Sequence, residues 1–522
     1  MGTPSQRGKR AARWLVLIAC SALPACQSLS PPEPSVSAAR LQEALAVIES
    51  PRANPRKIAA AQTEYRRTVD RILPSVLAVT AVPTFELAPP DPPDWRAADG
   101  FTSIEPVTRT RVSNPGLHRD GLGAPAVGRI FPGGPNAPRR GYQTPLTAIA
   151  LPQPSTTRFR LGLADPLHLD SVAVGGKEVP VAMDLDAPLD AARAMGPDIF
   201  AGLRYLLRAD RFRGQAKITF LQPYDPDKRP LVLVHGLMNS PRVWDRLVRD
   251  LLADPIVRDH YQIWFFFYPT AQPVPLSALQ LREALDDAVR RHDVRQPMVL
   301  IGFSMGGVLS RAQVSALTLA DAEQVLPGVS SLPEYSPARR ALVFEPRQDV
   351  SRVIFLFTPH RGSRLATWSP ALTVARLIRL PDWVRTELTD ALNVAFGQPV
   401  ESLPTSINGL SPNSSFLLAL DRTTPTVPTH SIIGNRGRRG SLLTSSDGVV
   451  PYTSAHLAWA ESELIVPTGH SGVDHALTVQ ELERILKENL ESYRDARADV
   501  RAPAASGCDQ AEASQKPSSD RW

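Results

Sequence analysis

The chain has 522 residues, of which 43% are hydrophobic and 21% are charged, so a wholly disordered chain is excluded and more than one simple core is expected. Its 51 prolines, roughly twice the average share, favour ordered loops and extended segments over a helix bundle. The formal net charge of +6 comes from basic residues spread along the chain, which argues against a nucleic-acid-binding surface.

The first 26 residues have the shape of a secretory signal. Basic residues precede an apolar stretch that begins at Trp14 and is too short for a convincing membrane-spanning helix. The segment resembles a bacterial lipoprotein signal, in which a cysteine becomes the lipidated first residue. Cys26 in "LPAC" is favoured because it leaves an apolar stretch of normal length, although Pro24 departs from the usual motif. Cys20 in "LIAC" fits that motif better but leaves only a short apolar stretch.

The resemblance predicts a lipoprotein anchored in the membrane of the bacterial cell envelope, in the outer membrane with its body on the periplasmic side or at the surface. A plain cleaved signal and an uncleaved anchor stay open as alternatives. Residues 27–37 are rich in Pro and Ser, which is typical of a tether between an anchor and a folded body. Only Cys508 would then be an ordinary thiol, so neither a disulfide framework nor a metal site is expected.

Residues 38–224 are predicted to form an N-terminal accessory region of helices followed by strands. Apolar residues at helical spacing between Ala38 and Leu73 predict a pair of helices. Residues 82–155 are dense in proline and glycine, so long loops with short strands are expected there.

Two strand signals follow in the same region. The segment "SVAVGGKEVPVAM" predicts a hairpin, in which Gly175 and Gly176 supply the positive φ angles that a two-residue turn needs. The segment from Ala216 to Tyr224 predicts another strand.

Residues 225–495 are predicted to form a parallel sheet covered by helices on both faces. Short runs that are apolar throughout alternate there with amphipathic helices, which is typical of such a sheet. The runs are 231–235, 263–268, 298–303, 352–357, 429–434 and 462–467. Active sites in such sheets form beyond the carboxyl ends of the strands. A polar tail, residues 496–522, is expected to be disordered.

The stretch "LIGFSMGGVLS" has the context of a nucleophile elbow, with a buried strand before Ser304 and a helix after it. A serine on such a sharp turn takes a strained backbone conformation, so the residues two before and two after it must be small. Gly302 and Gly306 meet this requirement, and Gly307 adds to it. Ser304 is therefore predicted to be the nucleophile rather than a polar residue in an ordinary turn.

The order nucleophile, acid, base places the remaining catalytic groups late in the chain. Asp447 follows the strand at 429–434 and lies before a glycine, where its carboxylate can hold an imidazole. His470 follows the last strand in the flexible segment "TGHSG" and is the predicted base. The predicted oxyanion donors are the amides of Leu237, which follows Gly236 in "VHGL", and of Met305.

Other acids and histidines are weaker candidates for these roles. Asp421 precedes its strand, and Asp474 follows the expected base. His475 is the main rival to His470, although it also suits a helix cap, and His456 comes before the last strand. His235 lies in the wrong part of the chain order and is predicted to shape the loop.

These motifs, "VLVHGL", "GFSMGG", "FTPHRGS", "SDGVVP" and "VPTGHS", together resemble the α/β-hydrolase superfamily and its bacterial lipase- and esterase-like members. The resemblance covers residues 225–493. It implies a Ser304, Asp447 and His470 triad that cleaves carboxylic esters through an acyl-enzyme, with no metal or organic cofactor. It also implies a structural or pocket-lining role for His360.

The substrate is less well defined by the sequence. An insertion at about 362–410 is apolar at helical spacing, including Trp368, Leu377, Ile378 and Trp383, and is expected either to be a lid over an acyl pocket or to pack on the sheet. A lipid anchor would place lipid esters within reach. Acyl transfer or amide cleavage by the same serine stays open, as does a non-catalytic scaffold for an unidentified envelope partner.

Overall fold

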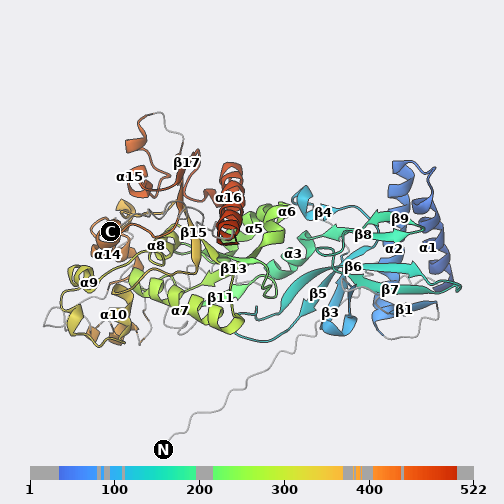
Figure 1. Ribbon diagram of the computed structural model, residues 1–522, viewed down its shortest axis with the longest axis horizontal. Helices are drawn as coiled ribbons and strands as arrows, with labels where there is room; N and C mark the ends of the chain where they lie inside the picture. The colour runs from blue at the N-terminus through green and yellow to red at the C-terminus, as the bar shows by residue number, and fades with distance from the viewer. Residues whose placement is uncertain are drawn as a thin grey trace, which may run out of the picture.

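The computed structural model describes residues 34–78, 84–87, 95–107, 112–194, 216–367, 404–436 and 440–501, with 380, 382, 384–387, 389 and 390 between them. The two larger sheets follow one another along the long axis of the molecule, one in the N-terminal region and one in the C-terminal part (Figure 1). The signal, the first part of the tether and the tail beyond Arg501 lie outside the described residues.

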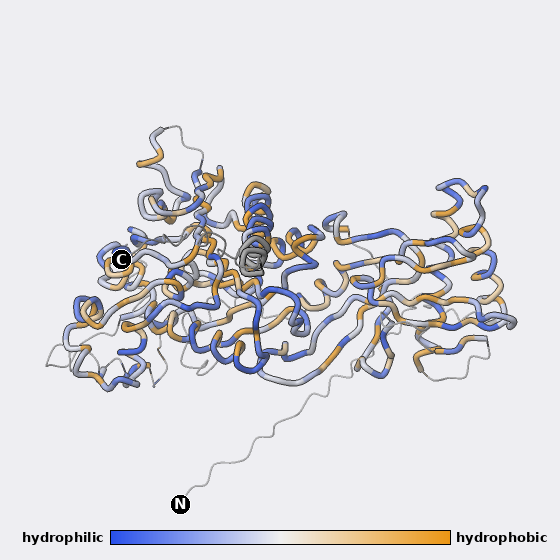
Figure 2. The backbone as a smooth tube through the Cα atoms, in the orientation of Figure 1, coloured by the Kyte–Doolittle hydropathy of each residue, from blue (hydrophilic) through white to orange (hydrophobic). Residues whose placement is uncertain are grey.

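The predicted helical pair is confirmed as α1 (Pro34–Glu49) and α2 (Pro55–Leu77). Polar and apolar residues alternate along both helices (Figure 2), and their apolar faces pack on each other and on the N-terminal sheet. Helix α1 begins within the predicted tether, and Ser37 is fully buried. A proline can open a helix because the first turn needs no N–H donor there, so the prolines of the tether did not delay the start of α1.

The N-terminal sheet has the order β1-β7-β6-β5-β3, and β2 also pairs with β7. Its strands are β1 (Phe85–Leu87), β2 (Trp95–Arg96), β3 (Ser103–Pro106), β5 (Ala124–Ile130), β6 (Tyr142–Pro152) and β7 (Phe159–Ala164). Only β1 and β7 pair in parallel.

The expectation of only short strands in residues 82–155 is wrong, because β6 has 11 residues and forms the middle of this sheet. Prolines within β5 and β6 concealed these strands in the sequence. Pro145 lies before the part of β6 that pairs with β7, and Pro125 lies beyond the part of β5 that pairs with β3. Pro145 therefore lies where β6 has a neighbour on one side only, and such a position tolerates a proline. Pro125 lies at the end of the pairing with β3, where its carbonyl still accepts a hydrogen bond from the amide of Val107.

Smaller elements connect this sheet to the C-terminal part. The predicted hairpin is confirmed as β8 (Ser171–Val174) and β9 (Lys177–Pro180), with φ of 56° at Gly175 and 80° at Gly176. Strands β4 (His118–Arg119) and β10 (Met183–Asp184) form a separate pair, and helix α3 (Asp186–Ala194) follows them.

The C-terminal sheet has seven strands in the order β11-β13-β12-β14-β15-β16-β17. They are β11 (Lys217–Phe220), β12 (Arg229–Val234), β13 (Tyr261–Phe267), β14 (Met298–Phe303), β15 (Val350–Leu356), β16 (Thr429–Gly434) and β17 (Ser462–Val466). All pairs are parallel except β11 with β13. The predicted parallel sheet is thus confirmed.

Helices cover both faces of this sheet, as predicted. The helices are α5 (Asp245–Ala253), α6 (Pro255–His260), α7 (Val274–His292), α8 (Met305–Arg311), α9 (Leu319–Val325), α10 (Pro337–Leu342), α13 (Ser406–Gly409), α14 (Ser415–Asp421), α15 (Tyr452–Ala455) and α16 (Ala476–Arg501). Val232 and Val234 of β12 pack in one core with α7 and α8, whereas Leu231 and Leu233 pack in the other with α5 and α16. A strand buried on both sides needs apolar residues at every position, which explains the continuous runs in the sequence.

The C-terminal sheet extends beyond the predicted bounds of 225–495. Strand β11 was grouped with the accessory region, but it forms the edge of this sheet. Helix α16 continues to Arg501, so the first residues of the predicted tail are helical. A run of strand residues does not show which sheet it joins, because the partner lies far away in the sequence.

A buried polar cluster joins the two parts. Asp186 at the start of α3 accepts hydrogen bonds from Ser113 and His118, and it forms an ion pair with Arg249 of α5. The same guanidinium pairs with Asp190 at 2.6 Å. Burial raises the pKa of Asp186, but the hydrogen bonds from Ser113 and His118 and the charge of Arg249 bring that pKa below its ordinary value.

Candidate active site

Ser304 lies on the sharp turn between β14 and α8, as the sequence predicts. Its backbone has φ of 54° and ψ of −123°, a conformation that residues with side chains rarely adopt. The backbone N–H donates to the carbonyl of Leu356 on the neighbouring strand β15 at 2.8 Å. The surrounding sheet therefore maintains the strain of a nucleophile elbow.

Two glycines permit this turn. A Cβ on Gly306 would lie 2.0 Å from the carbonyl oxygen of Val234 on β12, and a Cβ on Gly302 would lie 2.5 Å from the Cα of Gly307. Both contacts are with backbone atoms that cannot move aside. Glycine is thus required at both predicted positions, because β12, β14 and α8 converge there.

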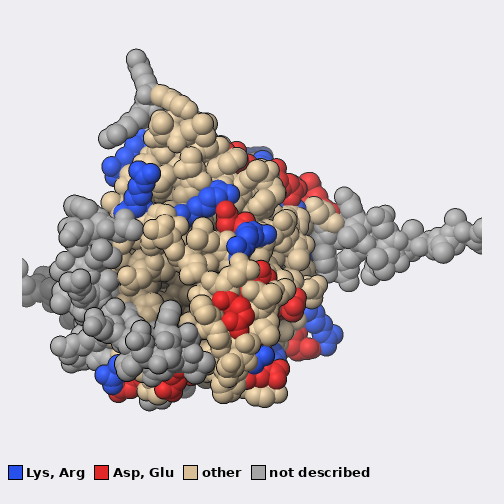
Figure 3. All heavy atoms as spheres, turned by 90° about the vertical axis from the view of Figure 1, so that its left-hand side faces the viewer, with Lys and Arg blue, Asp and Glu red and all other residues tan. Residues whose placement is uncertain are grey.

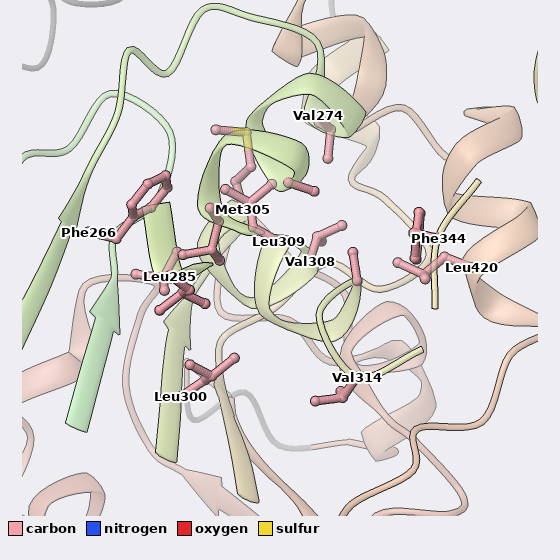
Figure 4. Packing of buried hydrophobic residues seen from close by; sticks show 14 of the residues in the cluster. Phe266, Val274, Leu285, Leu300, Met305, Val308, Leu309, Val314, Phe344 and Leu420 are labelled. Carbon is pink, nitrogen blue, oxygen red and sulfur yellow. The ribbon is translucent and has the colours of Figure 1, made fainter. Parts of the chain in front are cut away.

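The helix after the serine is fixed by packing. Met305, Val308 and Leu309 of α8 are buried in the core between the sheet and α7 (Figure 4). The turn at Ser304 is thus followed by a helix that packs against both the sheet and α7, and this packing limits movement of Ser304.

The structure brings the three predicted triad residues together. His470 Nε2 lies 2.9 Å from the Ser304 hydroxyl, and His470 Nδ1 lies 2.7 Å from Oδ2 of Asp447. Since an ionised carboxylate only accepts, Nδ1 carries the hydrogen, and Nε2 accepts from the serine. This is the arrangement that lets an imidazole take the proton of a serine.

The acid is held by its own loop. Oδ1 of Asp447 accepts hydrogen bonds from the amides of Val449 at 2.8 Å and Val450 at 2.7 Å, and the side chain is almost fully buried. These two bonds leave Oδ2 directed at His470. Sequence reasoning did not name the two amides, although an Asp-Gly pair is a recognisable signal for such a turn.

Two aromatic rings flank His470. The imidazole of His470 lies 5.2 Å from the ring of Phe303 and 6.3 Å from that of Phe357, measured between ring centres. Phe357 follows β15 with φ of 51°, which is unusual for an aromatic residue. No sequence signal marks a phenylalanine for this conformation, so sequence reasoning missed it.

Arg436 is a further residue that sequence reasoning missed. Its guanidinium lies over Gly448, where an added Cβ would meet Cζ at 2.3 Å, and a Cβ on Gly469 would lie 3.5 Å from Nε. Arg436 therefore lies across both the turn after Asp447 and the residue before His470. No sequence signal distinguishes this arginine from its neighbours.

The loop after β12 lies against Ser304. A Cβ on Gly236 would approach that of Ser304 to 2.9 Å, so this loop passes directly beside the serine. Leu237, one predicted oxyanion donor, is the next residue. Met305 opens α8, where the first amides have no partner within the helix. Both predicted donors thus adjoin the serine in the chain or in space.

The rival acids and bases lie elsewhere. Asp421 pairs with Arg361 at 2.9 Å, and Asp474 lies 3.8 Å from Arg246. His456 pairs with Glu463. The His475 ring accepts a hydrogen bond from the amide of Leu477, and it thereby caps the start of α16.

Two other histidines are buried in the scaffold. His235 stacks on Tyr268, and burial lowers its pKa to about 4. His360 contacts the edge of Phe355, and burial, with Arg311 and Arg361 nearby, holds its pKa well below the ordinary value. Both rings are therefore neutral near pH 7, and neither is hydrogen-bonded to Ser304, His470 or Asp447, in accord with the structural roles predicted for them.

Several predicted features lie outside the described residues. They include the lipidation candidates Cys20 and Cys26 and the apolar insertion residues Trp368, Leu377, Ile378 and Trp383. Within the insertion, Val384 is described and packs with Leu276 and Leu279 of α7.

The described part of the chain holds no group of three or more His, Cys, Asp or Glu side chains able to bind a metal ion. No helix in that part combines the length and the apolar character needed to cross a membrane.

Residues 231–483 match a family model described as the alpha/beta hydrolase family, and a search of curated proteins finds no match. Among solved structures, mature lipase BlEst2 of Bacillus licheniformis is 19% identical with a TM-score of 0.30, covering 52% of this chain and 97% of that one. EstA of Clostridium botulinum is 14% identical, with a TM-score of 0.30 and coverage of 48% and 83%. An alpha/beta superfamily hydrolase of Oenococcus oeni is 12% identical, with a TM-score of 0.30 and coverage of 55% and 98%.

The family match and the strand order together show the α/β-hydrolase fold in the C-terminal part of the chain. The predicted fold class is confirmed.

Proposed function

We propose that this domain is a serine hydrolase that cleaves carboxylic esters. The observation that carries the proposal is the unbroken chain of hydrogen bonds from Ser304 through His470 to Asp447, which begins at a strained turn between a strand and a helix. A structural role alone would give no reason for a serine to occupy such a conformation and also face a histidine.

The reaction follows from this geometry. His470 Nε2 takes the hydroxyl proton while the Ser304 oxygen attacks the ester carbonyl carbon, and the amides of Leu237 and Met305 stabilise the oxyanion. The intermediate then expels the alcohol, which takes the proton from His470. In the second half of the reaction, His470 takes a proton from water while the water oxygen attacks the acyl-enzyme. The carboxylic acid is released, and Ser304 regains its proton from His470.

Asp447 supports both steps. Its Oδ2 keeps the hydrogen of His470 on Nδ1, so that Nε2 can accept the serine proton, and its charge stabilises the imidazolium that forms. Phe303 and Phe357 limit rotation of the ring.

The substrate class that we propose is an ester with an apolar acyl group. Exposed apolar side chains adjoin the triad in the chain: Met238 follows the oxyanion loop, and Leu442 and Leu443 precede Asp447. On the end of the molecule with α9, α10, α14 and α15, Figure 3 shows a hollow whose described surroundings are mostly residues other than Lys, Arg, Asp and Glu. Uncharged surroundings favour an uncharged substrate.

A fluorophosphonate probe, which reacts with activated serines, tests the mechanism. We expect it to label the wild-type protein and the control Ser492→Ala, which changes an exposed serine of α16, but not Ser304→Ala. Hydrolysis of p-nitrophenyl esters across acyl lengths should disappear in the same variant, and the chain-length optimum separates esterase from lipase. A folded wild-type protein that takes no label would refute the proposal and favour the scaffold alternative.

The acyl acceptor is tested in the same assay. Added alcohols or amines that divert acyl groups from water would indicate acyl transfer, and cleavage of anilides would indicate amidase activity. We expect water to be the main acceptor and esters to be preferred.

We also propose that Cys26 carries a lipid that anchors the protein in the bacterial cell envelope. The support is the signal-like sequence before it. Metabolic labelling with an alkyne fatty acid should mark the wild type and Cys20→Ala but not Cys26→Ala. Labelling that is lost only in Cys20→Ala would assign the anchor to the other cysteine.

A further inference from the structure

A cavity of about 660 Å³ lies where the N-terminal region meets the hydrolase domain, on the face of the C-terminal sheet that α5 covers. Helix α3, helix α5, strands β11 and β13 and the start of β6 supply its walls. Figure 1 shows these elements at the centre of the molecule. None of the triad residues is among the described residues that line it. Its size is within the range of about 300–1,000 Å³ typical of small-molecule sites.

The base of the cavity is apolar. Phe265 and Phe267 project from β13, an inner strand, yet both are only half-buried because they border this space. Leu221, which follows β11, Val248 of α5 and Leu189 of α3 add aliphatic side chains to the lining. Aromatic and aliphatic side chains on three elements thus enclose one space, which suits a hydrocarbon chain.

Three cations of the lining have no acidic partner among the described residues. Arg139, Arg140 and Lys217 line the cavity, and within the described residues no acidic side chain pairs with any of them. Other charged residues of the lining are paired, Arg193 with Asp245 at 3.1 Å and Arg249 with Asp186 and Asp190. The uncompensated charge of the cavity is therefore positive.

Lys217 is the cation with the most unfavourable surroundings. Burial lowers the pKa of its ammonium group, and repulsion by Arg139 lowers it further. Lys217 also borders a second cavity that contains Glu283 and Asp287, but these acids pair with Arg340 and with Arg290 and Arg291. An anion bound between Lys217 and Arg139 would relieve both the desolvation and the repulsion.

We propose that this cavity binds an amphiphile with a single alkyl chain and an anionic end group. The chain lies on Phe265 and Phe267, and the anion contacts Lys217, Arg139 and Arg140. A fatty acid and an alkyl phosphate share this chemistry. The site is separate from the triad, so the inference goes beyond the proposed function and does not rest on it.

The cavity also borders the loop that follows β12. Pro241 and Arg242 line the cavity and lie in the chain shortly after Leu237, and Phe267 lies 6.1 Å from His235 between ring centres. A bound chain would therefore contact the segment that follows the proposed oxyanion donor.

Calorimetry on the full chain carrying Ser304→Ala and Cys26→Ala tests the proposal, because these changes remove turnover and any acyl group on the protein itself. Dodecanoate and dodecyl phosphate should both bind, with affinity rising from octanoate to dodecanoate, whereas dodecyltrimethylammonium should not. The tighter of the two anions identifies the natural head group. Equal binding of dodecanol would overturn the role of the cations, and no binding of either anion would overturn the site.

Variants locate the site. Thr219→Trp, which places an indole in the cavity, and Arg139→Gln with Arg140→Gln, which removes two exposed charges, should each weaken dodecanoate binding at least about tenfold. The matched control is Arg56→Gln with Arg67→Gln, two exposed arginines of α2. Unchanged binding in both cavity variants would place the ligand elsewhere and overturn the proposal. Circular dichroism of each variant checks that the fold is retained.

Discussion

Two buried carboxylates, one in each part of the molecule, have almost the same exposure and different consequences. Asp186 of the N-terminal region is 2% exposed and Asp447 of the hydrolase domain is 1% exposed. The partners of Asp186 are a serine, a histidine and an arginine that join the two parts. The histidine partner of Asp447 contacts a serine on a strained turn. Burial alone therefore does not single out an acid for catalysis, and the proposal for Asp447 rests on the serine at the end of its hydrogen-bond chain.

The largest expected effect comes from Asp447→Asn. The amide would donate to His470 and favour the tautomer with the hydrogen on Nε2, so kcat should fall by about 10⁴-fold. Thermal melting should change little, because the amide oxygen can still accept from Val449 and Val450. Ester hydrolysis and melting measured on the same preparation check this. Retention of activity within about tenfold would contradict the assignment of Asp447.

The matched change Asp186→Asn should affect stability instead. It leaves the buried Arg249 without its full countercharge, which costs about 3 kcal/mol in the free energy of unfolding. Turnover per folded molecule should be retained. Urea unfolding monitored by tryptophan fluorescence measures the loss. An Asp186→Asn variant of normal stability but slow ester hydrolysis would contradict a purely structural role for Asp186.

The pH dependence of stability sharpens this result. Because the pKa of Asp186 is lower in the folded protein than its ordinary 3.8, its contribution is complete above that value and is lost as the pH falls through the folded pKa. The difference in unfolding free energy between wild type and Asp186→Asn should therefore shrink below about pH 4. A difference that grows on acidification would contradict the lowered pKa.

A smaller expected effect compares two glycines. Gly306→Ala would place a methyl group 2.0 Å from the Val234 carbonyl, and we expect a loss of about 2–3 kcal/mol with reduced labelling of Ser304. Gly100→Ala in the N-terminal region has no atom within 4 Å of the added carbon and should be nearly neutral. Melting of both variants checks this, and equal effects would show that the elbow tolerates a side chain.

The smallest expected effect concerns α2. The Tyr65 hydroxyl donates to the carbonyl of Ala150 at 2.7 Å and accepts from its amide at 2.8 Å. Tyr65→Phe leaves both backbone groups without these bonds and should cost about 1–2 kcal/mol. Ester hydrolysis should be unchanged. A loss of activity larger than the loss of folded protein would indicate that the N-terminal region takes part in turnover.

The fold of the hydrolase domain was predictable because the signals for its strands and for the turn at Ser304 lie within short stretches of sequence. Strands such as β14 are apolar at every position, which two-sided burial demands, and the elbow glycines lie within a few residues of Ser304. Chain order then selected Asp447 and His470 from several candidates. Hydrogen bonds join both residues to Ser304 in the structure, through His470.

The N-terminal sheet was predictable only in part because its strands tolerate residues that normally interrupt strands. Pro125 and Pro145 lie where the pairing of their strand with a neighbour ends, and where it ends depends on residues far away in the sequence. The same limit applies to β11, whose partner β13 follows about forty residues later, and to Phe357, whose positive φ has no local sign.

The contact between Tyr65 and Ala150 also has a consequence for solubility. Strand β5 ends its pairing with β6 at Ala124 opposite Ala148, so β6 continues past its neighbour. The open N–H and C=O groups of such an overhang can pair with a strand of another molecule. The phenol occupies both groups of Ala150 from within the same chain, and both residues are fully buried, so this part of the β6 edge is closed to a strand of another molecule.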